Sequence, residues 1–160
     1  MAKTVVLVVA AGRGRRFGGD LPKQYHDLAG RMVLRHTLAA FACNPEIDFV
    51  RAVIHPDDRQ LYDMAAAGLN LLEPVSGGAS RQDSVRLGLE SLRELGATKV
   101  LIHDGARPFI DSGTIGRVIA ALERHPGALP AVPVADTLKR GLDGFVADTV
   151  DRSALFRAQT

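Results

Sequence analysis

Residues 5–11 form an uninterrupted apolar run, VVLVVAA, that ends at Gly12. A run of this length that is rich in valine and ends in glycine is typical of a strand covered on both faces. It is far shorter than the ~20 apolar residues that a membrane-spanning helix needs. Because strands of this kind occur mainly in parallel sheets with helices on each side, the run predicts an α/β fold.

The segments that follow alternate between strand-like and helix-like patterns. Further strands are expected at residues 49–55, 69–75, 99–103 and 128–134, and helices at 32–42, 57–67, 80–95 and 111–125. This order predicts parallel pairing through right-handed crossovers, and therefore a three-layer Rossmann-like sandwich with a mostly parallel sheet. Asp57 or Asp58 is expected to cap its helix, and Val85, Leu89 and Leu92 are expected to face inward on theirs.

The pattern changes after residue 135. Residues 136–140 and 145–150 are typical of two strands joined by a turn at residues 141–144. A lone hairpin is marginally stable unless it packs on something, so we expect support from a second subunit. The 160 residues are expected to form a single domain that is incomplete at its C-terminus, because no closing strand or capped helix follows the hairpin.

The positive charge of the chain is concentrated in one loop. The formal net charge is +2, yet residues 10–24 alone carry an excess of three positive charges, from Arg13, Arg15, Arg16 and Lys23 against Asp20. A compact positive loop suits a nucleotide phosphate, whereas a nucleic acid backbone requires an extended basic stripe. Aromatic residues for base stacking are also scarce, with two Tyr and no Trp. We therefore expect neither nucleic acid nor a membrane as partner.

The chain has one cysteine, Cys43. A single cysteine cannot form an intrachain disulfide, which favours a reducing, cytoplasmic location.

Three loops follow predicted strands, and ligands of open parallel sheets bind at the carboxyl ends of the strands. In the first loop, glycines let backbone N–H groups approach phosphate oxygens, while Arg16 and Lys23 bring positive charge to a leaving pyrophosphate. The alternative is a tight turn with solvated arginines. A dinucleotide-binding loop fits less well, because Gly12 and Gly14 match its first two glycines but Phe17 occupies the place of the third.

The second and third loops carry weaker signals when each is taken alone. Gly77 and Gly78 precede a helix start at Ser80, which favours either an anion site or a capping turn that binds nothing. Asp104 ends a strand and can hold Mg²⁺, while Arg107 can clamp a phosphate. The alternative is an Asp–Arg pair with a structural role only.

Several stretches together carry a resemblance to one family. They are AAGRGRR at 10–16, PKQY at 22–25, GG at 77–78 with Arg81, DSV at 83–85, HDGARP at 103–108, PV at 133–134, DTLKR at 136–140 and TVDR at 149–152. In this order they resemble the cytidylyltransferases that join CTP to 2-C-methyl-D-erythritol 4-phosphate in non-mevalonate isoprenoid synthesis. The first loop is shared with other nucleotidyltransferases, so a sugar-1-phosphate nucleotidyltransferase is the nearest alternative.

The resemblance implies a role for each matching residue. Arg16 and Lys23 would be catalytic, holding the triphosphate and stabilising the pentavalent transition state. The nucleotide pocket would be lined by Ala10, Ala11, Gly12, Gly14, Gly78 and Ser84. Methylerythritol phosphate would be held by Asp104, Arg107, Thr137 and Arg152, with Asp104 also binding Mg²⁺ and Arg152 reaching over from a partner subunit.

The resemblance also implies an assembly and a larger domain. Residues 136–156 would be an arm exchanged between the two subunits of a homodimer, which agrees with the unsupported hairpin. Family members continue past the position of Thr160, and some are fused to a cyclodiphosphate synthase domain. Ala79 departs from the pattern, because some members have an acidic residue there. Because family members continue past the position of Thr160, a nucleotide-binding fragment without turnover is a further alternative.

Overall fold

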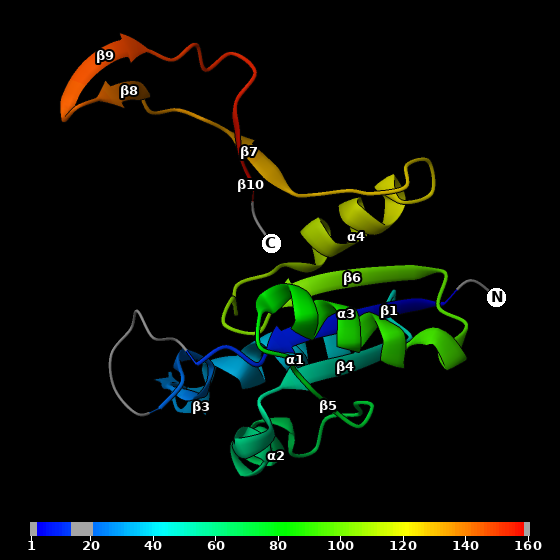
Figure 1. Cartoon of the computed structure of the whole chain (residues 1–160). Helices are drawn as coiled ribbons and strands as arrows, with labels where there is room; N and C mark the ends of the chain where they lie inside the picture. The colour runs from blue at the N-terminus through cyan, green and yellow to red at the C-terminus, as the bar shows by residue number, and fades with distance from the viewer. Residues whose placement is uncertain (1–2, 14–20, 159–160) are drawn as a thin grey trace.

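A four-stranded parallel sheet lies at the centre of the computed structural model, which describes residues 3–13 and 21–158 (Figure 1). The strand order is β5-β4-β1-β6. The strands are β1 (Thr4–Ala10), β4 (Phe49–Ile54), β5 (Val75–Ser76) and β6 (Lys99–Asp104). The apolar run near the N-terminus is thus a buried central strand, and the predicted α/β fold with parallel pairing is confirmed.

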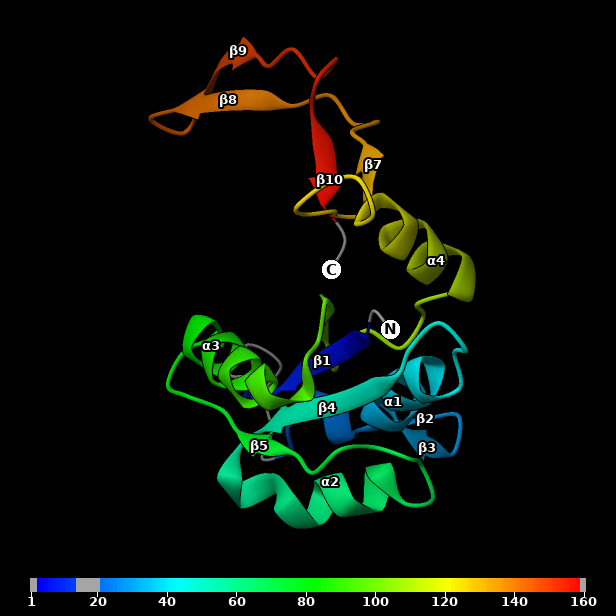
Figure 2. The same ribbon diagram turned by 90° about the vertical axis from the view of Figure 1, so that its right-hand side faces the viewer.

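Helices cover both faces of this sheet, as the sequence predicts (Figure 2). α1 and α2 lie against one face and α3 lies against the other, which gives three layers. The helices are α1 (Val33–Ala42), α2 (Arg59–Ala66), α3 (Arg81–Ser91) and α4 (Ser112–Ala121), with short 3₁₀ turns η1 (Lys23–Tyr25), η2 (Pro56–Asp58) and η3 (Arg93–Leu95). None of the helices in the described residues is long and apolar enough to cross a membrane.

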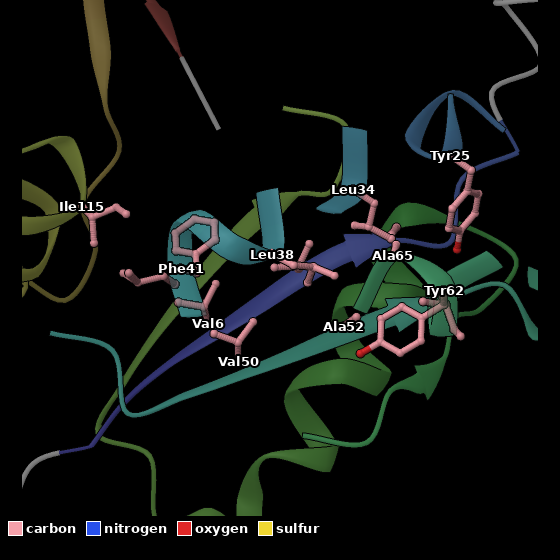
Figure 3. Close-up of a cluster of buried hydrophobic side chains, with 14 of the residues drawn as sticks. Val6, Tyr25, Leu34, Leu38, Phe41, Val50, Ala52, Tyr62, Ala65 and Ile115 are labelled. Carbon is pink, nitrogen blue, oxygen red and sulfur yellow. The ribbon is translucent and has the colours of Figure 1, made fainter. Parts of the chain in front are cut away.

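A cluster of buried apolar side chains lies between the sheet and α1 (Figure 3). Val6 of β1 packs there with Leu38 and Phe41 of α1, all of them buried. α4 contributes Ile115 to the same cluster. Burial of these side chains, about 25 cal/mol per Å² of apolar surface, stabilises the α1 layer against the sheet.

On the opposite face, the side of α3 that is buried differs from the prediction. Leu92 is buried as expected, but Val85 is only half-buried and Leu89 is exposed; the buried residues of α3 are Ser84 and Gly88. Gly88 faces the sheet closely, since a Cβ there would lie 2.5 Å from Leu7 Cδ2. The predicted face was wrong because only apolar residues were considered, whereas the close approach of helix to sheet requires a glycine.

Two predicted strands are shorter or paired differently. Of residues 69–75, only the last joins β5, although the Leu72 N–H donates to the Val50 carbonyl of β4 at 2.9 Å. Pro74, directly before β5, has no N–H for a ladder. Of residues 128–134, only β7 (Ala131–Pro133) is a strand, and it pairs antiparallel with β10 (Phe156–Ala158) rather than joining the parallel sheet. Prolines at 130 and 133 restrict this segment to edge pairing.

β8 (Lys139–Leu142) and β9 (Phe145–Thr149) form the predicted hairpin, which extends away from the sheet (Figures 1 and 2). Its turn has two residues, not four, because Leu142 pairs with Phe145. Asp143 and Gly144 both have positive φ, 51° and 82°, the conformation that a two-residue hairpin turn requires. A second small hairpin joins β2 (Asp27–Leu28) to β3 (Arg31–Met32).

Candidate functional site

The three predicted loops meet at the carboxyl edge of the sheet. The loop after β5 lies against the loop after β1, since a Cβ on Gly77 would be 2.4 Å from Ala11 Cβ. The loop after β6 lies against the end of β1, since a Cβ on Gly105 would be 2.8 Å from Ala10 Cβ. Glycine at positions 77 and 105 therefore allows the three strand ends to come together, as the sequence analysis predicts for a phosphate site.

A buried glutamine holds the first loop in place. Gln24 Nε2 donates hydrogen bonds to the carbonyl oxygens of Ala10 at 2.7 Å and Gly12 at 3.0 Å. Beside it on η1, Lys23 is exposed at the same edge. Sequence reasoning gave Gln24 no role, because the only signal is its place next to Lys23 in the PKQY stretch. Arg16 and Gly14 lie outside the described residues.

Arg13 belongs to the first loop but points toward the corner between β4 and α2. Its guanidinium donates to Asp58 Oδ1 at 3.0 Å and to Asp57 Oδ2 at 2.8 Å, and one nitrogen lies 2.9 Å from His55 Nδ1. The two aspartates thus bind Arg13 instead of capping a helix, and the cap of η2 is the His55 ring, which accepts from the Asp57 N–H. Part of the positive charge counted for the first loop is neutralised by this network.

The second loop is held by two serines, the N-cap of α3 and a buried residue within it. Ser80 caps the helix as predicted, because its Oγ accepts from the Asp83 N–H at 3.0 Å. Ser84 is buried, and its Oγ accepts from the Gly78 N–H at 3.1 Å while donating to the Ser80 carbonyl at 2.9 Å. Ser84 therefore fixes the glycine turn from beneath, and its predicted contact with a nucleotide stays a prediction.

In the third loop, Asp104 is held between two arginines. Arg81 Nη2 donates to Asp104 Oδ1 at 2.8 Å, and Arg107 Nε donates to Asp104 Oδ2 at 3.1 Å. Burial favours a raised pKa for Asp104, but the hydrogen bonds and charges of Arg81 and then Arg107 outweigh it, so the pKa lies below its usual range. Asp104 is therefore a carboxylate at neutral pH. Arg81 belongs to the stretches that carry the family resemblance, but the sequence analysis assigns it no role at this site.

The backbone of the third loop is tied to α1. Thr37 is buried in α1 and its Oγ1 donates to the Gly105 carbonyl at 2.9 Å, while the Gly105 N–H donates to the Val9 carbonyl at 2.8 Å. These two hydrogen bonds fix the backbone at Gly105, two residues before Arg107. Each of the three loops is thus held by one buried polar side chain.

His103 precedes Asp104 and faces the core. Its ring makes an edge contact with Phe41 at a centroid distance of 5.0 Å, and its Nδ1 has no hydrogen-bond partner within the described part of the chain. Burial, which outweighs the nearby charge of Asp104, lowers the pKa of His103 below its ordinary value. The ring is therefore neutral near pH 7.

A groove of about 1070 Å³ opens beside Arg81 and Arg107, between β6, α4 and residues 126–132. Its walls are largely apolar and include Ile102 and Phe109, both exposed. The groove therefore continues from the charged edge of the sheet onto an apolar surface.

Two predicted substrate-binding residues are not brought to this edge. Thr137 and Arg152 flank the β8–β9 hairpin, which extends away from the sheet (Figure 1). The Arg152 guanidinium donates to the Ala135 carbonyl at the base of the hairpin. The predicted role of Arg152 across a subunit boundary stays a prediction.

Comparisons with known proteins show which family has these three loops and this hairpin. The sequence pattern of IspD, 2-C-methyl-D-erythritol 4-phosphate cytidylyltransferase, matches residues 4–160. The chain belongs to this family. The match covers the three loops and the hairpin, and it confirms the resemblance stated above.

The curated relatives of this chain are longer than the chain itself, by different amounts. The chain is 89% identical over 160 residues to the bifunctional enzyme IspD/IspF of Paramagnetospirillum magneticum, covering 100% of this chain and 42% of that protein. It is 55% identical to the 2-C-methyl-D-erythritol 4-phosphate cytidylyltransferase of Cereibacter sphaeroides strain ATCC 17029, covering 98% of this chain and 70% of that protein. The chain thus spans less than half the length of the bifunctional relatives.

Solved structures of the family have the same fold. A crystal structure of 4-diphosphocytidyl-2C-methyl-D-erythritol synthase superposes with a TM-score of 0.85 at 35% identity, covering 100% of this chain and 73% of that one. The 2-C-methyl-D-erythritol 4-phosphate cytidylyltransferase from Thermus thermophilus gives a TM-score of 0.68 at 32% identity and covers 100% of this chain and 68% of that one. The α/β architecture derived from the apolar run is therefore that of the family.

Proposed function

We propose that this chain carries a cytidylyltransferase activity that moves a cytidylyl group from CTP to 2-C-methyl-D-erythritol 4-phosphate. The products are 4-diphosphocytidyl-2-C-methyl-D-erythritol and pyrophosphate. The observation that carries the proposal is the meeting of three glycine-containing loops with Lys23, Arg81 and Arg107 at one edge of the sheet, in a chain of this family.

The proposed reaction is an in-line displacement at the α-phosphorus of CTP. A phosphate oxygen of methylerythritol phosphate forms the new P–O bond, and the bond to the oxygen that bridges to the β-phosphorus breaks, so that pyrophosphate leaves with the electron pair. The attacking oxygen is already ionised at neutral pH, so no general base is required. The protein contributes positioning and charge, as in other phosphoryl transfers.

Different residues bind the triphosphate, the second substrate and the nucleoside in this proposal. Lys23 and Arg16 hold the triphosphate and stabilise the charge that builds in the transition state. Arg107 holds the phosphate of the second substrate, with Thr137 and Arg152 completing that subsite. The nucleotide pocket is lined by Ala10, Ala11, Gly12, Gly14, Gly78 and Ser84.

Mg²⁺ is part of the proposal, with Asp104 as its protein ligand. Mg²⁺ is commonly held by one or two carboxylates together with substrate phosphates and water, and Asp104 supplies one ionised carboxylate. No group of three His, Cys, Asp or Glu residues suited to a metal occurs among the described residues. In the proposal, phosphate oxygens and water supply the further ligands. Each oxygen of Asp104 accepts a hydrogen bond from a guanidinium group and keeps a further lone pair, with which it would bind the ion while Arg81 and Arg107 orient it. The bound ion supplies further neutralisation of the triphosphate charge.

The proposal includes a homodimer in the cytoplasm. The hairpin exposes Leu142, Phe145 and Val146, and such apolar side chains on a two-stranded ribbon favour a covering partner. A second copy of the chain is that partner, with Arg152 reaching its neighbour's site. The exposed Cys43 fits a reducing compartment.

Release of pyrophosphate tests the proposed activity. The protein that carries this chain is supplied with Mg²⁺, methylerythritol phosphate and either CTP, UTP or GTP. We expect the fastest release with CTP, and slower release when a sugar 1-phosphate replaces methylerythritol phosphate. Faster turnover of a sugar 1-phosphate would overturn the substrate assignment, and CTP binding by calorimetry without any release would support a binding domain instead.

A further inference from the structure

Gln24 is a long polar side chain that is almost fully buried, with 2% of its surface exposed. Its amide nitrogen has two N–H groups, and both are used, one on the Ala10 carbonyl and one on the Gly12 carbonyl. Burying an amide is unfavourable unless its hydrogen bonds are made, and an apolar side chain of similar length would fill the same space. The amide is therefore best explained by what it does to the loop.

The two carbonyls set the direction of the neighbouring N–H groups. In a trans peptide, the carbonyl of one residue and the N–H of the next point to opposite sides. Holding the Ala10 and Gly12 carbonyls inward therefore turns the N–H groups of Ala11 and Arg13 away from Gln24. Ala11 and Arg13 are two positions apart, and backbone N–H groups that leave a glycine-containing loop on the same side can bind one anion.

The same residue also determines where Lys23 lies. Gln24 and Tyr25 are the buried residues of η1, whereas Lys23 is exposed. A hydrogen bond from the Tyr25 N–H to the Pro22 carbonyl, 2.9 Å long, closes the turn. Because η1 is anchored through Gln24 to the loop after β1, the backbone of Lys23 is held in a fixed relation to the loop N–H groups.

We propose that Gln24 is a positioning residue, which turns the N–H groups of Ala11 and Arg13 and the side chain of Lys23 toward a common anion, the triphosphate. This rests on the proposed function for the identity of the anion. Gln24 itself does not touch the substrate. Its amide acts through the two carbonyls that it holds.

Two substitutions separate positioning from simple packing. Gln24→Met keeps the length of the side chain but removes both donors, and Gln24→Glu places an acceptor against two acceptors. The matched controls are Gln60→Met and Gln60→Glu on the exposed surface of α2. All variants are made in the full protein that carries this chain, and folding is checked by circular dichroism and thermal unfolding.

The first readout is binding of inorganic tripolyphosphate compared with CMP, which lacks the β- and γ-phosphates. We expect both Gln24 variants to bind tripolyphosphate at least about tenfold more weakly while the affinity for CMP changes less than about twofold, since misplaced donors lose the anion alone. The second readout is turnover, where kcat falls by at least about tenfold and KM for methylerythritol phosphate stays within about threefold. The Gln60 variants stay at wild-type values.

Other results of these binding experiments would overturn the proposal or call for a further measurement. Wild-type affinity for tripolyphosphate in either folded variant, or an equal loss for CMP, overturns the proposal. If both variants fail to fold, tripolyphosphate is titrated into the wild-type protein and amide NMR shifts are followed. Shifts at Ala11 and Arg13 support the proposal, and their absence overturns it. Wild-type protein that binds tripolyphosphate without turning over CTP would refute the proposed function while these binding comparisons still decide the role of Gln24.

Discussion

Arg81, the first residue of α3, donates from Nη2 to Oδ1 of Asp104, the last residue of β6, over 2.8 Å. The pair joins two loops that are far apart in the chain, and it leaves the second oxygen of Asp104 to Arg107. Both partners are partly exposed, so the pair contributes little to stability, about 0–1 kcal/mol. The main effect of the hydrogen bond from Arg81 is to orient the carboxylate of Asp104.

Replacing Arg81 should therefore impair turnover more than folding. We expect Arg81→Ala to lower kcat by more than about tenfold, because Asp104 loses a guanidinium group that orients it. The free energy of unfolding should fall by less than about 1 kcal/mol. Pyrophosphate release and urea denaturation measure the two effects. Arg86→Ala, which breaks an exposed pair with Glu90 on the same helix, is the control and should leave turnover unchanged.

Loss of positive charge at the first loop should slow the chemical step. Lys23→Ala is expected to lower kcat by more than about tenfold, because charge on the leaving pyrophosphate is no longer neutralised. Lys23 is exposed, so thermal unfolding should hardly change. We expect the same loss of turnover in Arg16→Ala, and a partial recovery in Lys23→Arg. Unchanged turnover in the alanine variants would remove the charge-stabilising role.

Adding a single methyl group at Gly88, by the substitution Gly88→Ala, should destabilise the fold. In Gly88→Ala the new Cβ meets Leu7 Cδ2 at 2.5 Å and Val53 Cγ2 at 2.8 Å, and both neighbours are fully buried. The expected loss is about 1–3 kcal/mol, even though alanine is the better helix former. Gly116→Ala on α4 is the control, since its nearest neighbour is the flexible carboxylate of Glu46. A Gly88→Ala variant as stable as the control would contradict the close packing of α3.

Arg13 should matter for stability because it neutralises a buried acid. Asp58 exposes only 3% of its side chain, and Arg13 is its charged partner. Arg13→Ala leaves this carboxylate buried and unpaired, at a cost of about 1–3 kcal/mol. Arg59→Ala, which removes an exposed partner of Asp63, should cost less than about 1 kcal/mol. Equal midpoints of urea unfolding for the two variants would count against the buried pair.

His103 should make the fold less stable in mild acid. Its pKa is lowered in the folded state, mainly by burial, so the unfolded chain binds more protons as the pH falls below the ordinary value of 6.5. The contribution is therefore fully present above that pH and is lost toward the folded pKa. We expect the free energy of unfolding to fall between about pH 7 and pH 5, and this dependence to be weaker in His103→Phe. Exposed His125, replaced in the same way, serves as the control.

The central architecture could be predicted because it depends on local patterns. The run at residues 5–11 is apolar throughout, and only a doubly covered strand fits it. Ser80 could be identified as a helix cap from its residue type and position, and its Oγ accepts the expected N–H group. Each of these inferences needs only a few neighbouring residues.

Other features depend on contacts between distant segments and left no local pattern. The pairing of β7 with β10 needs Phe156 to meet Pro133 and Ala158 to meet Ala131, which no neighbouring residue signals. The buried side of α3 is defined by how close Gly88 lies to β1 and β4. At the site, the roles of Gln24 and Arg81 arise from atoms brought together by the fold, whereas Lys23 and Asp104 could be identified from their motifs.

The glycines at 77 and 105 leave only hydrogen atoms between the backbones of three loops, at positions where any side chain would strike Ala11 or Ala10. Loops in such close contact cannot shift one at a time. Ordering of residues 11–13 around a bound anion is therefore transmitted to the turn at Gly78 and to Asp104 without a separate hinge. We therefore expect the three loops to respond together when an anion binds, so that filling one part of the pocket would alter the shape of the rest.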